Sequence, residues 1–217
     1  MKWKIKKNKK QTIGEEIANS ISHGLMILCN IIIFFIYFKT VDKVFFSWPL
    51  ILFFVSMFML YLISCLYHAL SFTVAKKKFQ KLDHICIYLL IWSTFIPFLF
   101  PKNNIIDINL FFFLIQTIII FLGIFFKIFW MNKGEKIHLF LYLLISWGGA
   151  IILLFLNEKI RNNQQVCNWL LLGGLFYTLG VYFYHNEYKK YYHFIWHIFV
   201  IIGNLCHNLS VYYFFNN

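Results

Sequence analysis

The chain has 217 residues, of which 61% are apolar and 22% aromatic, while only 13% are charged. A soluble domain carries about a quarter charged residues and cannot bury 28 phenylalanines in so short a chain, which excludes a water-soluble globular protein. The formal net charge of +12 comes from lysines between apolar runs, where it indicates membrane topology and contact with anionic headgroups rather than nucleic-acid binding.

A basic segment opens the chain, with six lysines among its first ten residues. It is similar to the start of a signal peptide, but no small-residue cleavage site follows, and Glu15 and Glu16 separate it from the first apolar run. We therefore expect this segment to be retained on the cytoplasmic side. Thr12 and Glu15 fit a capping box, which predicts a helix that begins near Ile13.

Seven apolar segments follow, and each is long enough to cross about 30 Å of hydrocarbon as a helix. They are predicted at Ser20–Phe38, Val44–Tyr67, His84–Phe100, Ile108–Phe126, Ile137–Leu156, Val166–Tyr184 and Phe194–Phe215. Polar breaks separate them at Lys39–Lys43, Lys76–Asp83, Pro101–Asp107, Lys127–Lys136, Asn157–Gln165 and His185–His193. No break is long enough for a further domain, so the predicted fold is all-α and integral to the membrane. Residues 1–19 are expected to form the basic segment, and residues 20–217 a single seven-transmembrane helix bundle.

The distribution of Lys and Arg residues predicts how the bundle lies in the membrane. With a cytoplasmic N-terminus, 15 of the 20 Lys and Arg residues fall in cytoplasmic segments and five in outer segments. The positive-inside rule applies because every loop is short. It predicts a cytoplasmic N-terminus and a C-terminus outside, which is opposite to the usual orientation of G-protein-coupled receptors.

Polar residues are concentrated at the cytoplasmic end of the predicted spans. Ser64 and His68 lie at the inner end of the second span, Asp83 begins the third, and His193 and His197 begin the seventh. Seven of the eight histidines fall near this face of the membrane. A lone histidine is more often structural than a ligand, whereas three histidines, an aspartate and a serine at one depth indicate a functional site.

The spacing of His193 and His197 favours a metal site. Residues four apart lie on one face of a helix, about one turn from each other. Neutral imidazole is a common protein ligand of zinc, and three protein nitrogens plus a water form the usual open catalytic zinc shell. We therefore predict that His68, His193 and His197 bind zinc.

The general base must come from another part of the chain. The motif is not H-E-x-x-H, because Phe194 follows His193. Asp83 is the candidate catalytic base, since a carboxylate beside a metal site can accept a proton from water. Ser64 lies one turn before His68, and its hydroxyl is the candidate for orienting the water or binding a substrate carbonyl. For Ser64, a hydrogen bond to its own helix backbone is the alternative.

Three other histidines are weaker candidates. The side chain of His84 points about 100° away from that of its neighbour Asp83 around a helix. His138 and His185 fit residues at the membrane interface. His84 could serve as a ligand, but none of the three is among the predicted ligands.

Prolines, glycines and cysteines suggest structural roles. Pro97 and Pro101 are expected to kink or end the third span. Gly173, Gly174 and Gly180 permit close helix packing in the sixth. Five cysteines are scattered through apolar runs without a C-x-x-C motif, and are interpreted as buried small side chains rather than disulfides: Cys29, Cys65, Cys86, Cys167 and Cys206.

Five segments together resemble the bacterial hemolysin III proteins, within the progestin and adipoQ receptor family. They are Gly14–Asn19 with His23 and Gly24; Ser64–His68; Leu82–His84 with Ile87–Ile91, Thr94, Pro97 and Phe98; Gly173–Gly180 with Phe183 and Tyr184; and His193–His197 with Val200 and Gly203. These segments follow one another in the family's order and cover nearly the whole chain.

The resemblance implies a seven-helix bundle in the bacterial inner membrane, with its N-terminus inside. It implies zinc bound by His68, His193 and His197, with Ser64 and Asp83 beside the metal. It also places the chain near a wider group of membrane hydrolases that includes alkaline ceramidases.

One stretch departs from the family pattern. Residues 93–98 read Ser-Thr-Phe-Ile-Pro-Phe, where the family usually has Gly-Thr-Tyr-Thr-Pro-Phe. Phe95 and Ile96 therefore each lack a hydroxyl, which puts a polar role of these two positions in doubt. The predicted zinc ligands are unaffected.

Three functions remain open from the sequence. The first is a zinc-dependent intramembrane hydrolase that cleaves amide or ester bonds of lipids. The second is a cytolytic or pore-forming protein, as the family name implies, although polar residues are concentrated at one end of the spans. The third is a non-catalytic protein that senses lipid or maintains the bilayer and holds a structural metal. Membrane lipids are the expected partners in each case, nucleic acid is not, and the sequence does not define the oligomeric state.

Overall fold

A computed structural model describes residues 11–41, 48–101, 107–129 and 135–216. The basic residues 1–10 and much of the predicted breaks after residues 41, 101 and 129 lie outside this part of the chain. Within it, the elements in chain order are α1 (Ile13–Thr40), α2 (Trp48–Ala69), α3 (Lys76–Leu99), α4 (Asp107–Phe129), α5 (Glu135–Leu156), α6 (Glu158–Asn162), α7 (Gln164–His185) and α8 (Tyr192–Asn216).

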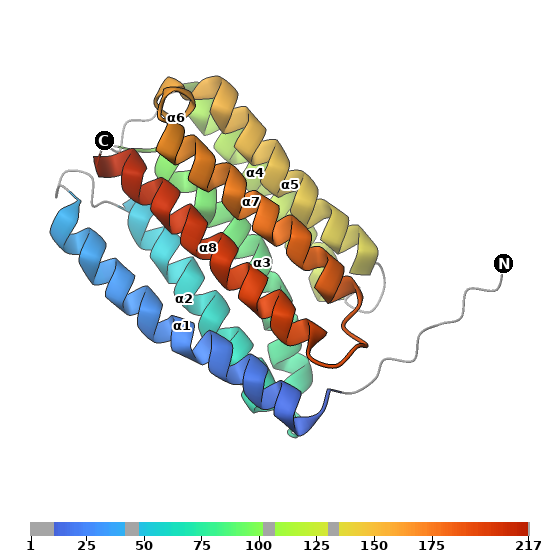
Figure 1. Cartoon of the computed structure of the whole chain (residues 1–217). Coiled ribbons are helices and arrows are strands. Elements are labelled where there is room, and N and C mark those ends of the chain that lie inside the picture. Colours follow the sequence, from blue (N-terminus) through green and yellow to red (C-terminus); the bar gives the residue numbers. More distant parts are fainter. Residues whose placement is uncertain (1–10, 42–47, 102–106, 130–134, 217) are drawn as a thin grey trace.

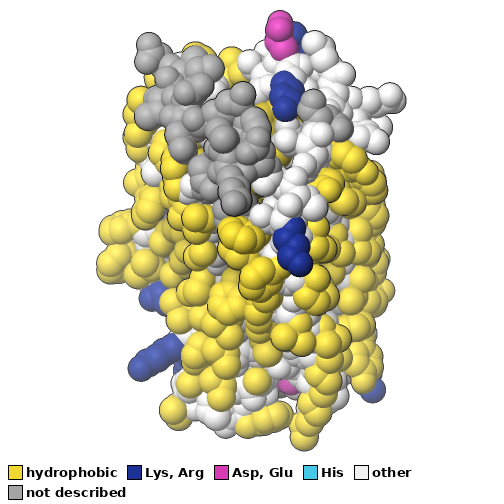
Figure 2. Space-filling model, turned by 90° about the vertical axis from the view of Figure 1, so that its left-hand side faces the viewer, with side chains coloured by type: hydrophobic (Ala, Val, Ile, Leu, Met, Phe, Trp, Pro, Cys, Tyr) yellow, Lys and Arg dark blue, Asp and Glu magenta, His cyan; other side chains and the backbone are white. Residues whose placement is uncertain are grey.

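Seven of these helices are long and apolar enough to cross a membrane: α1 to α5, α7 and α8. Helices suit this environment because they satisfy every backbone polar group internally, where no water is at hand to do so. Figure 2 shows hydrophobic side chains over most of the face of the bundle that it presents. The predicted all-α membrane fold with seven spans is confirmed.

The start of α1 follows the predicted capping box. The Thr12 hydroxyl accepts a hydrogen bond from the Glu15 amide at 3.4 Å, and the Glu15 carboxylate accepts one from the Thr12 amide at 2.8 Å. Two backbone amides at the helix start are thereby satisfied. The helix begins at Ile13, as expected.

Two predicted breaks contain helix instead. Residues 76–83 form the first two turns of α3, so Asp83 lies within that helix rather than just before it. The break at residues 157–165 contains the short helix α6, whose N-cap Asn157 accepts a hydrogen bond from the Ile160 amide at 3.2 Å. Charged side chains marked these stretches as loops, but charge alone does not prevent helix formation at the end of a span.

The long helices lie side by side in one bundle (Figure 1). Helix α8 packs along α7 and also contacts α1 and α3, while α2 contacts both α1 and α3. The starts of α1, α3 and α8 and the end of α2 meet at one end of the bundle, which we call the histidine end. This arrangement brings the first and last spans of the chain together.

Two predicted close-packing glycines lie between α7 and α8. A Cβ atom on Gly173 would stand 2.2 Å from Cδ2 of His207 and 2.9 Å from the carbonyl oxygen of Gly203. One on Gly180 would stand 2.8 Å from the Trp196 ring. No larger side chain fits at these distances, so the close approach of the two helices depends on the glycines.

Buried polar groups also run deeper into the bundle than the sequence suggested. Asn204 donates to the Tyr61 hydroxyl at 3.0 Å, Asn208 to the Asn204 carbonyl at 3.0 Å, and Ser210 to the Val166 carbonyl at 2.8 Å. The polar groups concentrated at one end are therefore joined by others deeper in the bundle. These groups bond to one another and to backbone, as polar residues that join membrane helices do.

Candidate functional site

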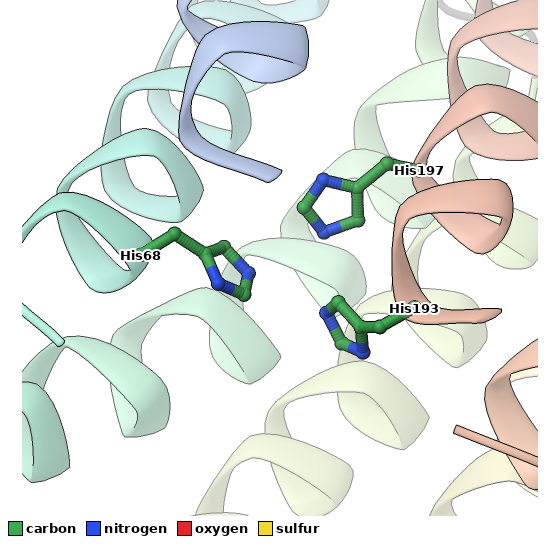
Figure 3. A group of neighbouring side chains, drawn as sticks. All are labelled: His68, His193 and His197. Carbon is green, nitrogen blue, oxygen red and sulfur yellow. The ribbon is translucent and has the colours of Figure 1, made fainter. Parts of the chain in front are cut away.

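Three histidines meet at the histidine end of the bundle. His68 comes from the last turn of α2, and His193 and His197 come from the first two turns of α8. Figure 3 shows the three rings pointing toward one another from the two helices. One ring nitrogen of each lies within 4.8 Å of those of the other two, so a small approach of the rings would let the three share a metal ion.

The ring of His68 is held from α1. Its Nδ1 lies 2.7 Å from Oε2 of Glu16, and the other carboxylate oxygen of Glu16 bonds the Lys76 ammonium group. An ionised carboxylate only accepts hydrogen bonds, so Nδ1 of His68 is the donor. The neutral ring therefore keeps its lone pair on Nε2, which is buried and has no hydrogen-bond partner among the described residues.

His193 and His197 also donate a hydrogen bond from Nδ1. Nδ1 of His193 lies 2.8 Å from the Glu187 carboxylate, so it donates in the same way. Nδ1 of His197 lies 3.2 Å from the Ser22 hydroxyl, whose single proton is donated to the Asn19 carbonyl at 2.8 Å. That hydroxyl can only accept from His197.

All three imidazoles thus use Nδ1 as a donor and leave Nε2 for another partner. Binding of a metal through Nε2 needs this tautomer, and histidines bound to metals are commonly held by a carboxylate or another acceptor on the opposite nitrogen. Two of the three side chains, His68 and His197, are almost fully buried, and a buried ring nitrogen that lacks a hydrogen-bond partner is costly. The donor set fits zinc, which prefers histidine nitrogens in a closely spaced group.

The start of α8 is fixed by a contact to α1. The backbone amide of Tyr191 donates to Oε1 of Glu15 at 2.7 Å. Tyr191 has a φ of 61°, a left-handed conformation that costs a tyrosine about 1–2 kcal/mol. Because His193 follows two residues later, the Glu15 contact helps to define where its ring lies.

Asp83 and Ser64 lie beside the three histidines. Both are buried, and the Ser64 hydroxyl bonds the Asp83 carboxylate. They line one cavity together with His193 and His197. The structure therefore brings the predicted base, serine and histidines to one place, although Asp83 comes from the interior of α3.

The cavity is long and mostly apolar. It encloses about 110 Å³ and follows α7 from Leu170 to Tyr184, a length of about 21 Å along the helix. Apolar groups such as Leu143 and Trp147 form most of its wall, and His207 lies at its deep end. A narrow apolar space of this kind suits an extended hydrocarbon chain, while the polar groups gather at one end.

The remaining histidines fall in different places. His138 was interpreted as an interfacial residue, but it is buried and its Nδ1 lies 2.8 Å from the Tyr88 hydroxyl. His84 lines the same cavity without joining the three predicted ligands, whereas His185 is exposed at the end of α7. His23 stacks on His197 with ring centroids 3.8 Å apart.

Sequence reasoning missed the groups that hold the rings. Glu187 lies six residues before His193 in the loop that precedes α8, and Ser22 directly precedes His23. Neither residue belongs to a recognisable motif in the sequence. Glu16 was noted as a polar residue near the first span, but without a partner. Because each acts on a histidine from a different helix or loop, only the tertiary structure pairs them.

Comparison with known proteins agrees with this fold. The family model described as "Haemolysin-III related" matches residues 11–208. The chain is 34% identical to "Hemolysin-3 homolog" of Bacillus subtilis (strain 168), covering 89% of this chain and 91% of the relative. It is 34% identical to "Hemolysin-3" of Bacillus cereus, covering 89% of each chain. A more distant relative is "Monocyte to macrophage differentiation factor" of Homo sapiens, which is 23% identical over 93% of this chain and 85% of the relative. The chain belongs to the haemolysin-III related family and is a multi-pass bacterial membrane protein.

Proposed function

We propose that this protein is a zinc-dependent hydrolase that cleaves an amide or ester bond of a lipid within the membrane. The observation that carries the proposal is the common tautomer of His68, His193 and His197, each with Nδ1 engaged as a donor. A purely structural cluster would not require the Nε2 atoms of three rings from two helices to be left for one shared partner. The cavity that His193 and His197 line also holds a buried carboxylate and hydroxyl, those of Asp83 and Ser64.

The three histidines would hold the metal, and zinc at such a site supplies a Lewis acid that polarises a carbonyl and activates water at neutral pH. Side chains of the protein would transfer the proton. Asp83 would accept a proton from the attacking water at a carboxylate oxygen and return it to the leaving amine or alcohol, as the new C–O bond replaces the scissile bond. The Ser64 hydroxyl holds the Asp83 carboxylate in place.

The shape of the cavity supports a lipid substrate. An acyl chain lying along α7 would place its apolar length against Leu143, Trp147 and Leu170, with its carbonyl at the histidine end. Apolar walls exclude bulk water from the reacting groups and so strengthen electrostatic interactions among them. A water-soluble substrate would have little polar surface to bind along most of this space.

We also propose that the N-terminus and the histidine end lie on the cytoplasmic side of the membrane. The histidine end carries the lysines of the first turn of α3 and of the loop between α7 and α8, including Lys77, Lys78, Lys189 and Lys190. The positive-inside rule puts that end in the cytoplasm. Labelling single cysteines with a membrane-impermeant reagent in intact cells would test this, and reaction at position 78 from outside the cell would reverse the orientation.

The printed names of the Bacillus relatives suggest a second candidate, a cytolytic activity. The alternative without catalysis is a lipid sensor in which the metal only ties α2 to α8. A solute-flux assay in liposomes tests the cytolytic activity, since a hydrolase predicts no protein-dependent flux. Hydrolysis of any lipid amide or ester by the purified protein excludes the non-catalytic lipid sensor.

The first experiment is to measure zinc in the detergent-purified protein, wild type against His197→Ala. We expect about one zinc per chain in the wild type and a large loss in the variant, because three nitrogens form the shell. A folded wild type without metal would remove the basis of the proposal. With zinc bound, lipid amides and esters are then screened against the wild type and Asp83→Asn.

A further inference from the structure

His207 is a buried histidine inside α8, at the deep end of the cavity. It follows His197 by ten residues, which corresponds to about 15 Å along the helix. Ionisable side chains within a membrane span are rare, and by default they mark a functional site. Because His207 is too far from the three proposed ligands to share a metal ion with them, its role must be a different one.

The hydrogen bond of His207 defines its tautomer. Its Nε2 lies 3.2 Å from the carbonyl oxygen of Leu170 in α7, and a carbonyl oxygen only accepts, so Nε2 carries the proton. A charged ring inside an apolar span is costly, so the ring is neutral and its lone pair is on Nδ1. The three proposed ligands have the opposite tautomer, since they donate from Nδ1. Nδ1 of His207 is therefore an acceptor.

The ring of His207 is held in one orientation by its neighbours. A Cβ atom on Gly173 would stand 2.2 Å from Cδ2 and 2.5 Å from Nε2 of His207, so this edge of the ring lies against α7. The Tyr177 ring meets it edge to face, with ring centroids 5.4 Å apart. The opposite edge, which carries Nδ1, is therefore turned away from Gly173.

Nδ1 of His207 still needs a hydrogen-bond donor. It is buried, and it has no hydrogen-bond partner among the described residues. A buried polar atom without a partner is costly, so one that is held in place calls for an occupant of the site that supplies the missing donor. His207 lines the cavity together with Leu170 and Tyr177, and the cavity is the space from which such an occupant can approach.

We propose that Nδ1 of His207 accepts a hydrogen bond from a hydroxyl group on the acyl chain of the lipid in the cavity. The inference deepens the proposed function and rests on it for the position of the carbonyl at the histidine end. An extended chain advances about 3.5 Å in three bonds, so the 15 Å between His197 and His207 correspond to about twelve bonds. The preferred lipid would carry its hydroxyl at that distance from the carbonyl, whereas a plain hydrocarbon chain would leave Nδ1 without a partner.

Binding of analogues that cannot be cleaved tests the proposal without turnover. The full-length protein in detergent binds a nitroxide-labelled long-chain methyl ketone, which has the carbonyl but no scissile bond and quenches the fluorescence of Trp147 and Trp196 in the cavity wall. Unlabelled ketones then displace it. We expect the ketone with a hydroxyl about twelve carbons from the carbonyl to compete about fivefold better than the plain ketone. The isomer with its hydroxyl half as far along the chain should show no such gain.

Two results with the wild type would overturn the proposal. Equal competition by the three ketones would mean that Nδ1 of His207 bonds only a buried water. An equal gain for both hydroxylated isomers would mean that the gain does not come from one acceptor at a fixed depth. These comparisons need no substitution, so they decide the question even where a variant fails to fold.

His207→Gln localises the effect. The glutamine amide can still donate to the Leu170 carbonyl, but it has no acceptor at the position of Nδ1, so the preference for the hydroxylated ketone should disappear. His185→Gln, at an exposed position at the end of α7, is the matched control and should keep the preference. A folded His207→Gln protein that keeps the preference would overturn the proposal, and so would an equal loss in both variants.

The same titration with His197→Ala separates this inference from the proposed function. The variant lacks a proposed zinc ligand about 15 Å from His207, and the preference should persist. Its persistence supports the role of His207 even where zinc binding or hydrolysis fails. Loss of the preference in this variant would place its origin at the metal site and overturn the assignment to His207. Hydrolysis by a wild type without the preference would overturn this inference alone.

Discussion

The imidazole of His68 and the carboxylate of Glu16 form a buried pair that joins α2 to α1, with Nδ1 and Oε2 2.7 Å apart. A second pair, His193 with Glu187, holds another proposed ligand at 2.8 Å. The two carboxylates differ in exposure, since the Glu16 side chain is 4% exposed and that of Glu187 is 44% exposed. Water can therefore take over the hydrogen bond of the exposed Glu187 carboxylate to His193, but it cannot reach the buried Glu16 carboxylate to replace its bond to His68.

Glu16→Gln should therefore weaken zinc binding about tenfold, because the carboxylate that orients His68 and favours its ligating tautomer is lost. Affinity is measured by competition with a chelator of known affinity in detergent. Glu187→Gln is the matched control, and its effect should be clearly smaller. A larger loss in Glu187→Gln than in Glu16→Gln would contradict the importance assigned to burial.

Asp83→Asn should strongly reduce turnover while zinc remains bound, since asparagine fills the same space but cannot accept the proton. The expected loss in kcat is about 10²- to 10⁴-fold, as for other general bases. Ser64→Ala should cost less, because it only removes a group that holds Asp83. The measurement is the rate of lipid hydrolysis beside the zinc content of the same sample, and full activity of the asparagine variant would exclude Asp83 as the base.

Gly173→Ala should destabilise the bundle by about 1–3 kcal/mol, because the new methyl group would overlap His207 and approach the Gly203 carbonyl. Gly148→Ala is the control on α5, where a Cβ meets nothing within 4 Å. It should be neutral or slightly stabilising, since alanine favours helix. Thermal unfolding in detergent compares the two, and equal midpoints would show that α7 and α8 are not closely packed at Gly173.

Tyr61→Phe should reduce stability by about 0.6 kcal/mol, the average measured for hydrogen bonds between membrane helices, and by at most about 1.7 kcal/mol. The change removes the acceptor that Asn204 of α8 bonds at 3.0 Å. Tyr182→Phe, at an exposed position of α7, serves as the comparison and should leave the unfolding midpoint unchanged. Equal effects of both substitutions would mean that the buried hydrogen bond contributes nothing.

The sequence predicts the spans well because their signal is local. About twenty apolar residues in a row can satisfy the backbone in a membrane only as a helix, and the capping box at Thr12 and Glu15 is read within four residues. The sequence predicts helix ends less well where charged residues occur. At Lys76–Asp83 charge suggested a loop, although a helix can continue through the polar interface.

Only part of the site can be predicted from the sequence, because only part of its signal is local. The i,i+4 spacing of His193 and His197 is a property of one helix, and their depth near His68 follows from span order. Rotation of each helix about its axis does not follow from the sequence. His138 and Lys127 were therefore treated as interfacial and loop residues, although both face the cavity, and Glu187 was not connected to His193.

The order in which the chain is made adds a consequence for assembly. Ser22 and His197 are 175 residues apart in sequence, and Glu15 and Tyr191 are 176 apart, yet each pair is in contact. The last span must therefore enter the membrane before the three histidines can meet, so a partly synthesised chain has only His68 in place. Loading with metal would then report completed insertion, and a chain that ends before α8 would reach the membrane unable to acquire it.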